Sequence, residues 1–250
     1  MSGVLGLIPA RGGSRGIPRK NVALVHGRPL LAYTCDAALG SRRLTRVIVS
    51  TDDDEIAQVG LACGVEVPFR RPADLARAET PSLPVARHAL QWLREHDGWE
   101  PDVVVLLQPT SPLRRAGHID AALDCMEATA ADTVVSVVPV PHRYSPYSIA
   151  QIRDGWLRDF WEQAVAFERF RRQDTPVLYA RNGPAVLACR TRVLLELDSF
   201  FGEHVVPYVM SEEESVDVDT AFDLQVAEWL VSRRAHESVV RNAPPPEARA

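Results

Sequence analysis

The chain has 250 residues, of which 46% are hydrophobic and 24% are charged, a balance typical of folded globular proteins rather than disordered ones. Its net charge of −5 argues against a general nucleic-acid surface, because such binding requires a basic face that neutralises phosphates. No apolar run approaches the roughly 20 residues needed to cross a bilayer, and no charged segment precedes an apolar one at the start, so we expect a cytoplasmic protein that does not bind membranes.

The first part of the chain alternates apolar runs with amphipathic segments. The predicted strands span residues 4–9, 46–50 and 66–69. The predicted helices run from Pro29 to Gly40, from Asp53 to Gly64 and onward from Thr80. The first strand ends in a glycine-rich loop, which is typical of a buried parallel strand that leads into a ligand-binding loop.

A continuous apolar run at residues 103–107 predicts a central strand buried on both faces, and a polar loop follows it at residues 108–114. A helix at 117–128 and a strand at 133–138 continue the alternation. Alternating strands and helices of this length imply a parallel sheet with helices on both faces. We therefore predict an α/β fold, a Rossmann-like three-layer α/β/α arrangement around a mostly parallel sheet.

The alternation stops at Pro139, where Pro, Arg and aromatic residues begin to interrupt short apolar runs. We interpret residues 140–200 as an excursion from the sheet. A last amphipathic helix is predicted from Thr220, and the Pro- and Ala-rich residues 236–250 predict a disordered tail. The predicted organisation is a single domain over residues 1–235.

The loop at residues 10–16 is the first candidate site, because open α/β sheets bind ligands outside the carboxyl ends of their strands. Its glycines let backbone N–H groups approach an anion, and four basic side chains surround them: Arg11, Arg15, Arg19 and Lys20. Lys20 is the only lysine among the 28 basic residues, which indicates a need for a compact charge. Neither the G-x-G-x-x-G nor the P-loop spacing is present, so we predict a different polyphosphate cradle, with a plain turn as the alternative.

A second candidate site is the acidic segment Ser-Val-Asp-Val-Asp at residues 215–219. In an extended backbone Asp217 and Asp219 lie on one face and the valines on the other. Mg²⁺ prefers one or two carboxylates together with phosphate oxygens and waters. We therefore predict a magnesium site here, the alternative being Asp219 as a helix N-cap and Asp217 in solvent.

The stretch from Leu7 to Asn21 resembles the signature of the acylneuraminate cytidylyltransferases, also called CMP-sialic acid synthetases. Further matches follow in order between residues 4 and 232, at 50–53, 71–76, 107–114, 172–173, 182–183, 200–201 and 215–220. The resemblance implies a nucleotide-diphospho-sugar transferase-like fold and Mg²⁺ as cofactor. It also implies a reaction in which the anomeric hydroxyl of a nine-carbon α-keto acid sugar attacks the α-phosphate of CTP, giving a CMP-sugar and pyrophosphate.

The resemblance implies roles for individual residues as well. The implied catalytic residues are Lys20, Arg11, Arg15 and Asp217, and Asp217 with Asp219 would hold the magnesium. The implied CTP-binding residues are Ala10, Arg11, Gly12, Ser14, Arg15, Lys20, Asn21 and Ser82. The implied acceptor-binding residues are Gln108, Thr110, Ser111, Arg172, Tyr179, Arg181, Phe200 and Phe201.

The acceptor region departs from the family pattern. Where many members carry Tyr-Arg-x-Asn-Gly-Ala, residues 179–184 read Tyr-Ala-Arg-Asn-Gly-Pro. Arg143, Arg172 and Arg181 remain candidates for binding the acceptor's carboxylate, but a shift of one residue along a strand would turn the side chain of Arg181 to the opposite face.

This departure leaves the acceptor open among several acids. The alternatives are a sialic, legionaminic or pseudaminic-type acid, a deaminated nonulosonate, Kdo and a phosphonate. The chain lacks a Gln-Gly-Asp-Glu-Pro motif after its fourth strand, which counts against Kdo. A catalytically silent nucleotide-binding protein is a further alternative, and the presence of Lys20, Gln108 and both aspartates counts against it.

The excursion at residues 140–200 resembles the family's dimerisation segment, in which each subunit completes its partner's acceptor pocket. We therefore expect a homodimer that binds CTP and an acidic sugar and binds no nucleic acid. Aromatic residues available for the interface are Phe160, Trp161, Phe167 and Phe170. The alternative is that these side chains fold back on their own subunit.

Overall fold

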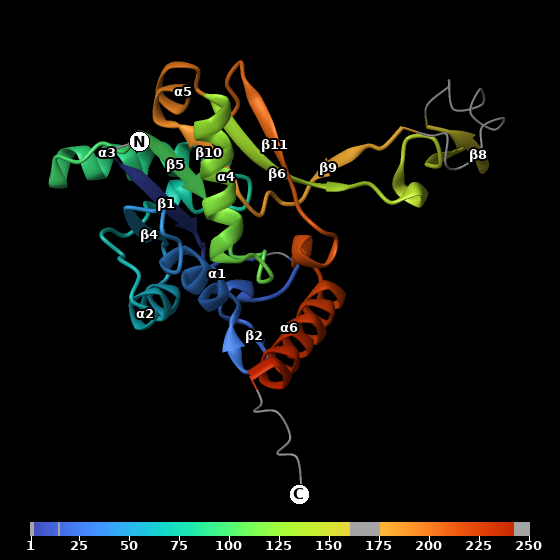
Figure 1. Ribbon diagram of the computed structural model, residues 1–250, viewed down its shortest axis with the longest axis horizontal. Helices are drawn as coiled ribbons and strands as arrows, with labels where there is room; N and C mark the ends of the chain where they lie inside the picture. Colours follow the sequence, from blue (N-terminus) through green and yellow to red (C-terminus); the bar gives the residue numbers. More distant parts are fainter. Residues whose placement is uncertain (1–2, 15, 161–175, 243–250) are drawn as a thin grey trace, which may run out of the picture.

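The computed structural model describes residues 3–14, 16–160 and 176–242. The strands of its main sheet are β1 (Val4–Pro9), β4 (Arg46–Ser50), β5 (Val103–Leu106), β6 (Thr133–Pro139), β9 (Tyr179–Arg181), β10 (Leu187–Arg190) and β11 (Val205–Val209). Their spatial order is β11–β6–β10–β5–β1–β4 (Figure 1). The short strand β9 pairs antiparallel with the carboxyl end of β6. β1 is parallel to β4 and β5, β11 is parallel to β6, and β10 runs antiparallel between β5 and β6. The prediction of a mostly parallel sheet is confirmed.

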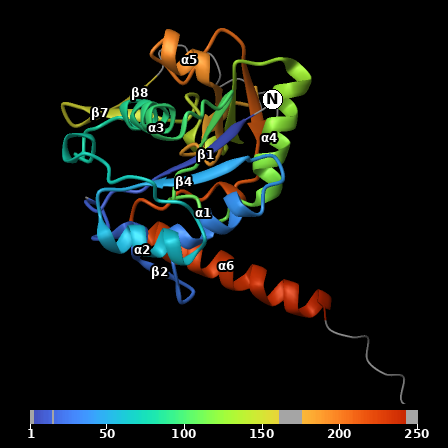
Figure 2. The same cartoon turned by 90° about the vertical axis from the view of Figure 1, so that its left-hand side faces the viewer.

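Helices cover both faces of the sheet (Figure 2). They are α1 (Leu30–Leu39), α2 (Asp54–Ala62), α3 (Ser82–Asp97), α4 (Ala116–Thr129), α5 (Thr191–Glu196) and α6 (Ala221–Asn242). α1, α2 and α4 pack on one face and α3 and α5 on the other, which is the predicted three-layer arrangement. Within the described residues, none of these helices is long and apolar enough to cross a bilayer.

β5 shows why the sheet is buried on both faces. Val103 and Val105 pack with α1 and α4, whereas Val104 and Leu106 pack with α3, and all four side chains are at most 2% exposed. Side chains alternate along a strand, so an unbroken apolar run fills two cores at once. The central strand therefore holds the two helical layers together, and its carboxyl end lies at the middle of the sheet edge.

A third, smaller core joins the two ends of the chain. The hairpin of β2 (Leu24–Val25) and β3 (Arg28–Pro29) packs against α6, and the His26 backbone N–H donates to Glu228 Oε1 at 3.3 Å. Val218 lies in this core with no exposed surface. The acidic segment 217–219 is thereby held beside the loop that follows β1.

The remaining ordered elements are short. They are the hairpin strands β7 (Ala150–Arg153) and β8 (Trp156–Asp159) and the single-turn helices η1 (Lys20–Val22), η2 (Ala73–Leu75), η3 (His142–Tyr144) and η6 (Glu213–Ser215). The β7–β8 hairpin projects from the body of the molecule beyond the ends of β6 and β9 (Figure 1).

Three sequence-based boundaries are corrected by the structure. Residues 66–69 do not form a strand: Glu66 makes an isolated bridge to Ile48 in β4, and a second isolated bridge joins Arg70 to Thr51. Residues 140–200 are only partly an excursion, because β10 returns to the middle of the sheet and pairs with β5 and β6. The predicted disordered tail begins too early, because α6 continues to Asn242; residues 243–250 lie outside the described part.

Candidate active site

A cavity of about 430 Å³ opens at the carboxyl ends of β1 and β5. This is the edge at which open α/β sheets bind their ligands. It is lined by Pro9, Arg11, Ser14, Gly16, Lys20, Asn21, Arg71, Thr80, Ser82, Val85, Gln108, Pro109, Thr110, Gly183, Asp217 and Asp219. The lining comes from six separate segments, so the cavity exists only in the assembled fold.

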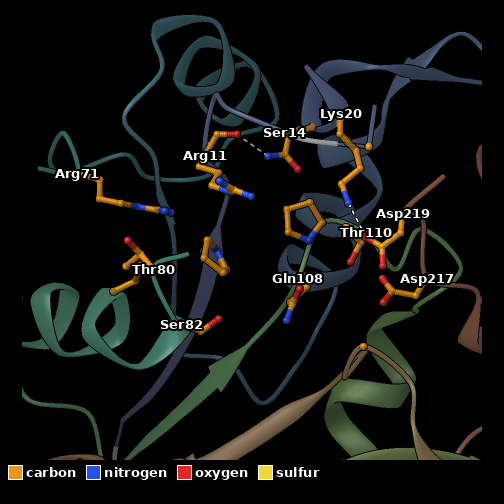
Figure 3. A pocket seen from close by; sticks show the side chains of 16 residues that line it. Arg11, Ser14, Lys20, Arg71, Thr80, Ser82, Gln108, Thr110, Asp217 and Asp219 are labelled. Carbon is orange, nitrogen blue, oxygen red and sulfur yellow. Dashed lines mark hydrogen bonds and ion pairs between the residues drawn. The ribbon is translucent and has the colours of Figure 1, made fainter. Parts of the chain in front are cut away.

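The cavity has two chemically different sides (Figure 3). Arg71, Thr80 and Ser82 lie on one side, next to the start of α3. Lys20, Asp217 and Asp219 lie on the other side. An elongated anion that lay across the cavity would therefore meet hydroxyl groups and a guanidinium at one end and an ammonium with carboxylates at the other.

Lys20 connects the loop after β1 to the acidic segment. Its Nζ donates to the carbonyl oxygen of Val218 at 2.8 Å and to Asp219 Oδ1 at 2.8 Å. The lysine side chain is 16% exposed, whereas that of Asp219 is 70% exposed. One ammonium group thus joins two cavity walls and still reaches the cavity.

Asp217 presents a carboxylate oxygen, Oδ1, that is buried and makes no hydrogen bond of ordinary geometry in the described structure. Burial raises the pKa of Asp217 above its ordinary value, the Thr110 hydroxyl opposes this by a smaller amount, and the neighbouring Asp219 raises the pKa further. Buried polar atoms are normally paired, so this oxygen indicates a missing donor or cation.

The donor set fits a magnesium ion. Two carboxylates from Asp217 and Asp219 face the cavity, and Mg²⁺ commonly takes one or two carboxylates and completes its shell with phosphate oxygens and water. The described residues contain no cluster of three or more acidic, His or Cys side chains that would hold a metal alone. A cation at these aspartates would need a ligand's oxygens as well.

Two glycines, Gly16 and Gly183, allow Asp219 and Asp217 to lie directly against the backbone of neighbouring loops. A Cβ at Gly16 would lie 2.3 Å from the carbonyl oxygen of Asp219. A Cβ at Gly183 would lie 2.8 Å from Asp217 Oδ2, and the φ of Gly183 is +103°, a conformation that other residues rarely adopt. A side chain at either position would clash with residues 217–219, so both glycines are needed for the close packing of this segment.

Arg19 does not contribute to the cavity, so counting it in the polyphosphate cradle was wrong. Its guanidinium donates from Nη1 and Nη2 to Asp53, at 3.2 and 3.0 Å, and also pairs with Glu55. Hydrogen bonds from Arg19 lower the pKa of Asp53, which also caps α2 by accepting from the Ile56 N–H at 3.0 Å. The arginine ties the loop to the start of α2, close to the helix start predicted at Asp53.

Arg71 is a cavity residue to which sequence reasoning gave no role. It is 5% exposed, and it donates from Nε to Ser50 Oγ at 3.1 Å and from Nη2 to the Ser50 carbonyl oxygen. Burial lowers the pKa of Arg71 to about 10, so it stays charged at neutral pH. The only available signal was its place in a segment that matched the family.

The structure brings together many of the residues implied for CTP, metal and acceptor. Those that line the cavity are Arg11, Ser14, Lys20, Asn21, Ser82, Gln108, Thr110, Asp217 and Asp219. Those described elsewhere are Ala10, Gly12, Ser111, Tyr179, Arg181, Phe200 and Phe201. The guanidinium carbon of Arg181 lies 4.5 Å from the centre of the Phe201 ring. Arg15 and Arg172 lie outside the described residues, as do Trp161, Phe167 and Phe170.

The close approach at Gly16 generates a stability prediction. Gly16→Ala should lower the free energy of unfolding by about 1–3 kcal/mol, because the added methyl group cannot fit against the Asp219 carbonyl without displacing backbone. Gly13→Ala is the matched control, since a Cβ there meets nothing within 4 Å. Urea unfolding of both variants measures the difference, and equal stabilities would contradict the contact.

Comparison with known proteins places these features in a family. The family model described as Cytidylyltransferase matches residues 5–234. A CMP-N,N'-diacetyllegionaminic acid synthase of Legionella pneumophila is 32% identical over 235 residues, which cover 91% of this chain and 96% of that protein. An N-acylneuraminate cytidylyltransferase of Escherichia coli is 29% identical over 237 residues, covering 94% of this chain and 54% of that protein.

A solved structure gives the same answer for the fold. A CMP:2-keto-3-deoxy-manno-octonic acid synthetase complexed with CTP aligns with a TM-score of 0.68 at 17% identity, covering 93% of this chain and 100% of that one. At that identity the likeness concerns the fold alone. Together with the match over residues 5–234, it agrees with the resemblance seen between Leu7 and Asn21. The chain belongs to the cytidylyltransferase family.

Proposed function

We propose that this protein transfers CMP from CTP to the anomeric hydroxyl of a sialic-acid-like nonulosonic acid and releases pyrophosphate. The observation that carries the proposal is the cavity in which Lys20 and two aspartates meet opposite Arg71 and Ser82. Family membership and the names of the two relatives support the same activity. A reaction that consumes CTP also fits the cytoplasmic location expected from the sequence.

The two sides of the cavity suit the two parts of CTP. Arg11, Ser14 and Lys20 offer cations and a hydroxyl to the triphosphate, as the resemblance implies, with Arg15 from the same loop. The other side offers hydrogen-bonding groups to the nucleoside, namely Arg71, Thr80 and Ser82, and the resemblance implies Asn21 as a further nucleoside contact. Asn21 is itself held in place, because its Nδ2 donates to the Arg11 carbonyl oxygen at 2.9 Å.

Transfer requires an in-line displacement at the α-phosphorus. A bond forms between the acceptor's anomeric oxygen and phosphorus, the bond to the bridging oxygen of the β-phosphate breaks to release pyrophosphate, and the hydroxyl proton passes to solvent water. Such transfers depend on positioning and neutralisation of charge rather than on a covalent enzyme intermediate. The residues of this chain therefore bind, orient and balance charge, and no nucleophilic side chain is required.

Asp217 and Asp219 are the residues proposed to hold Mg²⁺. When bound, the ion would neutralise charge on the triphosphate oxygens. Lys20 keeps Asp219 in place through the 2.8 Å ion pair, and Gly183 lets Asp217 approach the cavity wall. Both aspartates flank Val218, which is anchored in the core beside α6, so their positions are held relative to each other.

The acceptor is proposed to be a nonulosonic acid of the sialic or legionaminic type. The relatives' names support this class, and Gln108 and Thr110 line the cavity where an acceptor would meet the α-phosphate. The register of β9 places Arg181 opposite Val137, whereas Ala180 lies opposite Val138 on the other face of the sheet. Arginine at 181 instead of 180 therefore changes the face on which the charge stands.

The acceptor assignment has a direct test. Pyrophosphate release with CTP and Mg²⁺ should occur with one or more of N-acetylneuraminic, legionaminic and pseudaminic-type acids. Kdo and small phosphonates should be inactive, and ATP, GTP and UTP should not replace CTP. Activity with Kdo or a phosphonate alone would overturn the acceptor class, and CTP binding without turnover on any acid would contradict the enzyme itself.

The metal assignment predicts the effect of Asp217→Ala. The variant should lose roughly 3–4 kcal/mol of transition-state stabilisation, or 10²- to 10³-fold in turnover, because charge on the phosphates is no longer balanced. Glu212→Gln is the matched control, because Glu212 is an exposed acidic residue five positions earlier in the chain. Turnover measured across a magnesium titration distinguishes them, and unchanged turnover of Asp217→Ala would refute the metal role.

We also propose a homodimer formed through the β7–β8 hairpin. Ile152 and Leu157 are directly paired across this hairpin and are 77% and 73% exposed, and Trp156 beside them is 68% exposed. Large apolar side chains clustered on a projecting hairpin indicate a surface that another molecule covers. The resemblance of residues 140–200 to a dimerisation segment supports a second copy of the chain as that molecule.

The dimer prediction concerns mass in solution. The wild-type protein should sediment at about twice its chain mass of 27.7 kDa, and Leu157→Asp should sediment as a single chain. Leu61→Asp is the control, because Leu61 is 59% exposed on α2, away from the hairpin. A wild-type protein that sediments only as 27.7 kDa species would rule out the dimer.

A further inference from the structure

Arg114 is a buried cation without a buried anion. Its side chain ends the polar loop after β5 and is only 3% exposed. The hydrogen-bond acceptors of its guanidinium in the described part of the chain are two main-chain carbonyl oxygens and one hydroxyl, not a carboxylate. Burial lowers the pKa of Arg114 to about 9, so the guanidinium remains charged at neutral pH in an unfavourable environment. Burying a charge that has no opposite charge beside it lowers stability, so this guanidinium indicates a specific role for Arg114.

The guanidinium contacts three separate segments of the chain. Nη1 donates to the carbonyl oxygen of Gln108 at 3.1 Å and to that of Ala185 at 2.6 Å. Nη2 donates to Thr34 Oγ1 in the middle of α1. The Thr34 hydroxyl in turn donates to the same Gln108 carbonyl oxygen at 3.4 Å, which closes a small network.

Two of these segments form walls of the cavity. Gln108 lines it directly, and Ala185 follows Gly183, which lines it beside Asp217. The turn at residues 182–185 is further fixed because the Ala185 N–H donates to Asn182 Oδ1 at 3.3 Å. Arg114 is therefore a clamp whose two main-chain acceptors set the separation of the Gln108 loop from the Gly183 turn.

The nucleoside side of the cavity is built without Arg114. Arg71 is held by Ser50, and Asn21 is held by the Arg11 carbonyl oxygen. Ser82 stands at the first position of α3. None of these contacts includes Arg114 or its three partners, so loosening the clamp should leave this side intact.

We propose that Arg114 is a positioning residue for the acceptor, holding the Gln108 loop and the Gly183 turn at the separation that the transfer requires. The inference rests on the proposed function, because it assigns the acceptor to the part of the cavity between these two walls. A planar guanidinium can reach oxygens of three segments at once, whereas a lysine ammonium on a linear chain cannot reproduce that geometry.

The test compares Arg114→Lys with Arg190→Lys. The control arginine also donates to a main-chain carbonyl, from Nε to the Ala131 oxygen at 2.9 Å, and it stands at the opposite end of β10 from the clamp. Thr34→Val removes one partner and keeps the arginine. Each variant is assayed for kcat and KM with the active acid and for the CTP Kd by calorimetry.

Arg114→Lys should lower kcat/KM for the acceptor by about 30-fold or more while CTP affinity stays within about threefold, since small misplacement of a reactant is costly in transfer reactions. Thr34→Val should shift the same parameter in the same direction by a smaller factor, and Arg190→Lys should change neither. Parallel losses in acceptor and CTP parameters would show a merely structural role and overturn the proposal, as would unchanged kinetics.

Amide hydrogen exchange supplies a readout that needs no acceptor. In Arg114→Lys the amides of Ser111 and Ala185 should exchange faster, because the carbonyls on both sides of the clamp are released, while amides of β1 keep their protection. Wild-type inactivity with every acid would refute the proposed function and leave this comparison intact. Unchanged exchange at Ser111 and Ala185 would refute the clamp.

Discussion

The cavity depends on one ammonium group that joins segments almost a whole chain apart. Lys20 Nζ bonds to the Val218 carbonyl oxygen and to Asp219, and these partners are 198 and 199 residues away in sequence. The position of the Val218 carbonyl is fixed, because the Val218 side chain is fully buried between α6 and the β2–β3 hairpin. The last helix is thus a structural part of the site, even though its own side chains do not line the cavity. Its packing decides where the two aspartates stand.

The glycine-rich loop serves packing as well as anion binding. Gly16 is required where the Asp219 carbonyl passes, and the backbone N–H of Gly12 is already used by Asp52 Oδ1 at 3.0 Å. The basic residues of the same loop divide in a similar way, because Arg19 faces Asp53 and not the cavity. Some groups of this basic loop therefore hold the loop in place and do not face the cavity. Among its described basic residues, Arg11 and Lys20 line the cavity.

The sequence predicted the elements whose signal is local and missed those that depend on distant partners. The strand at residues 103–107 and the start of the helix at Asp53 were visible because burial and capping follow from adjacent residues. β10 was missed because four residues of an antiparallel strand carry no periodic pattern, and their burial comes from β5 and β6 on either side. The arginines show the same limit. Arg19 finds its partner 34 residues away and Arg114 finds one 71 residues away, so charge alone could not tell a scaffold arginine from a ligand-binding one.

Because this chain has a single lysine, the group that closes its cavity is also its only side-chain primary amine. Reagents that acylate amines therefore have one internal target besides the chain's α-amino group. That target is 16% exposed and engaged with Val218 and Asp219, so its modification requires those contacts to open. Acylation would remove the positive charge and with it the donors that join the two walls. The fraction of molecules acylated at Lys20 thus reports the fraction in which the contact between Lys20 and residues 218–219 has opened.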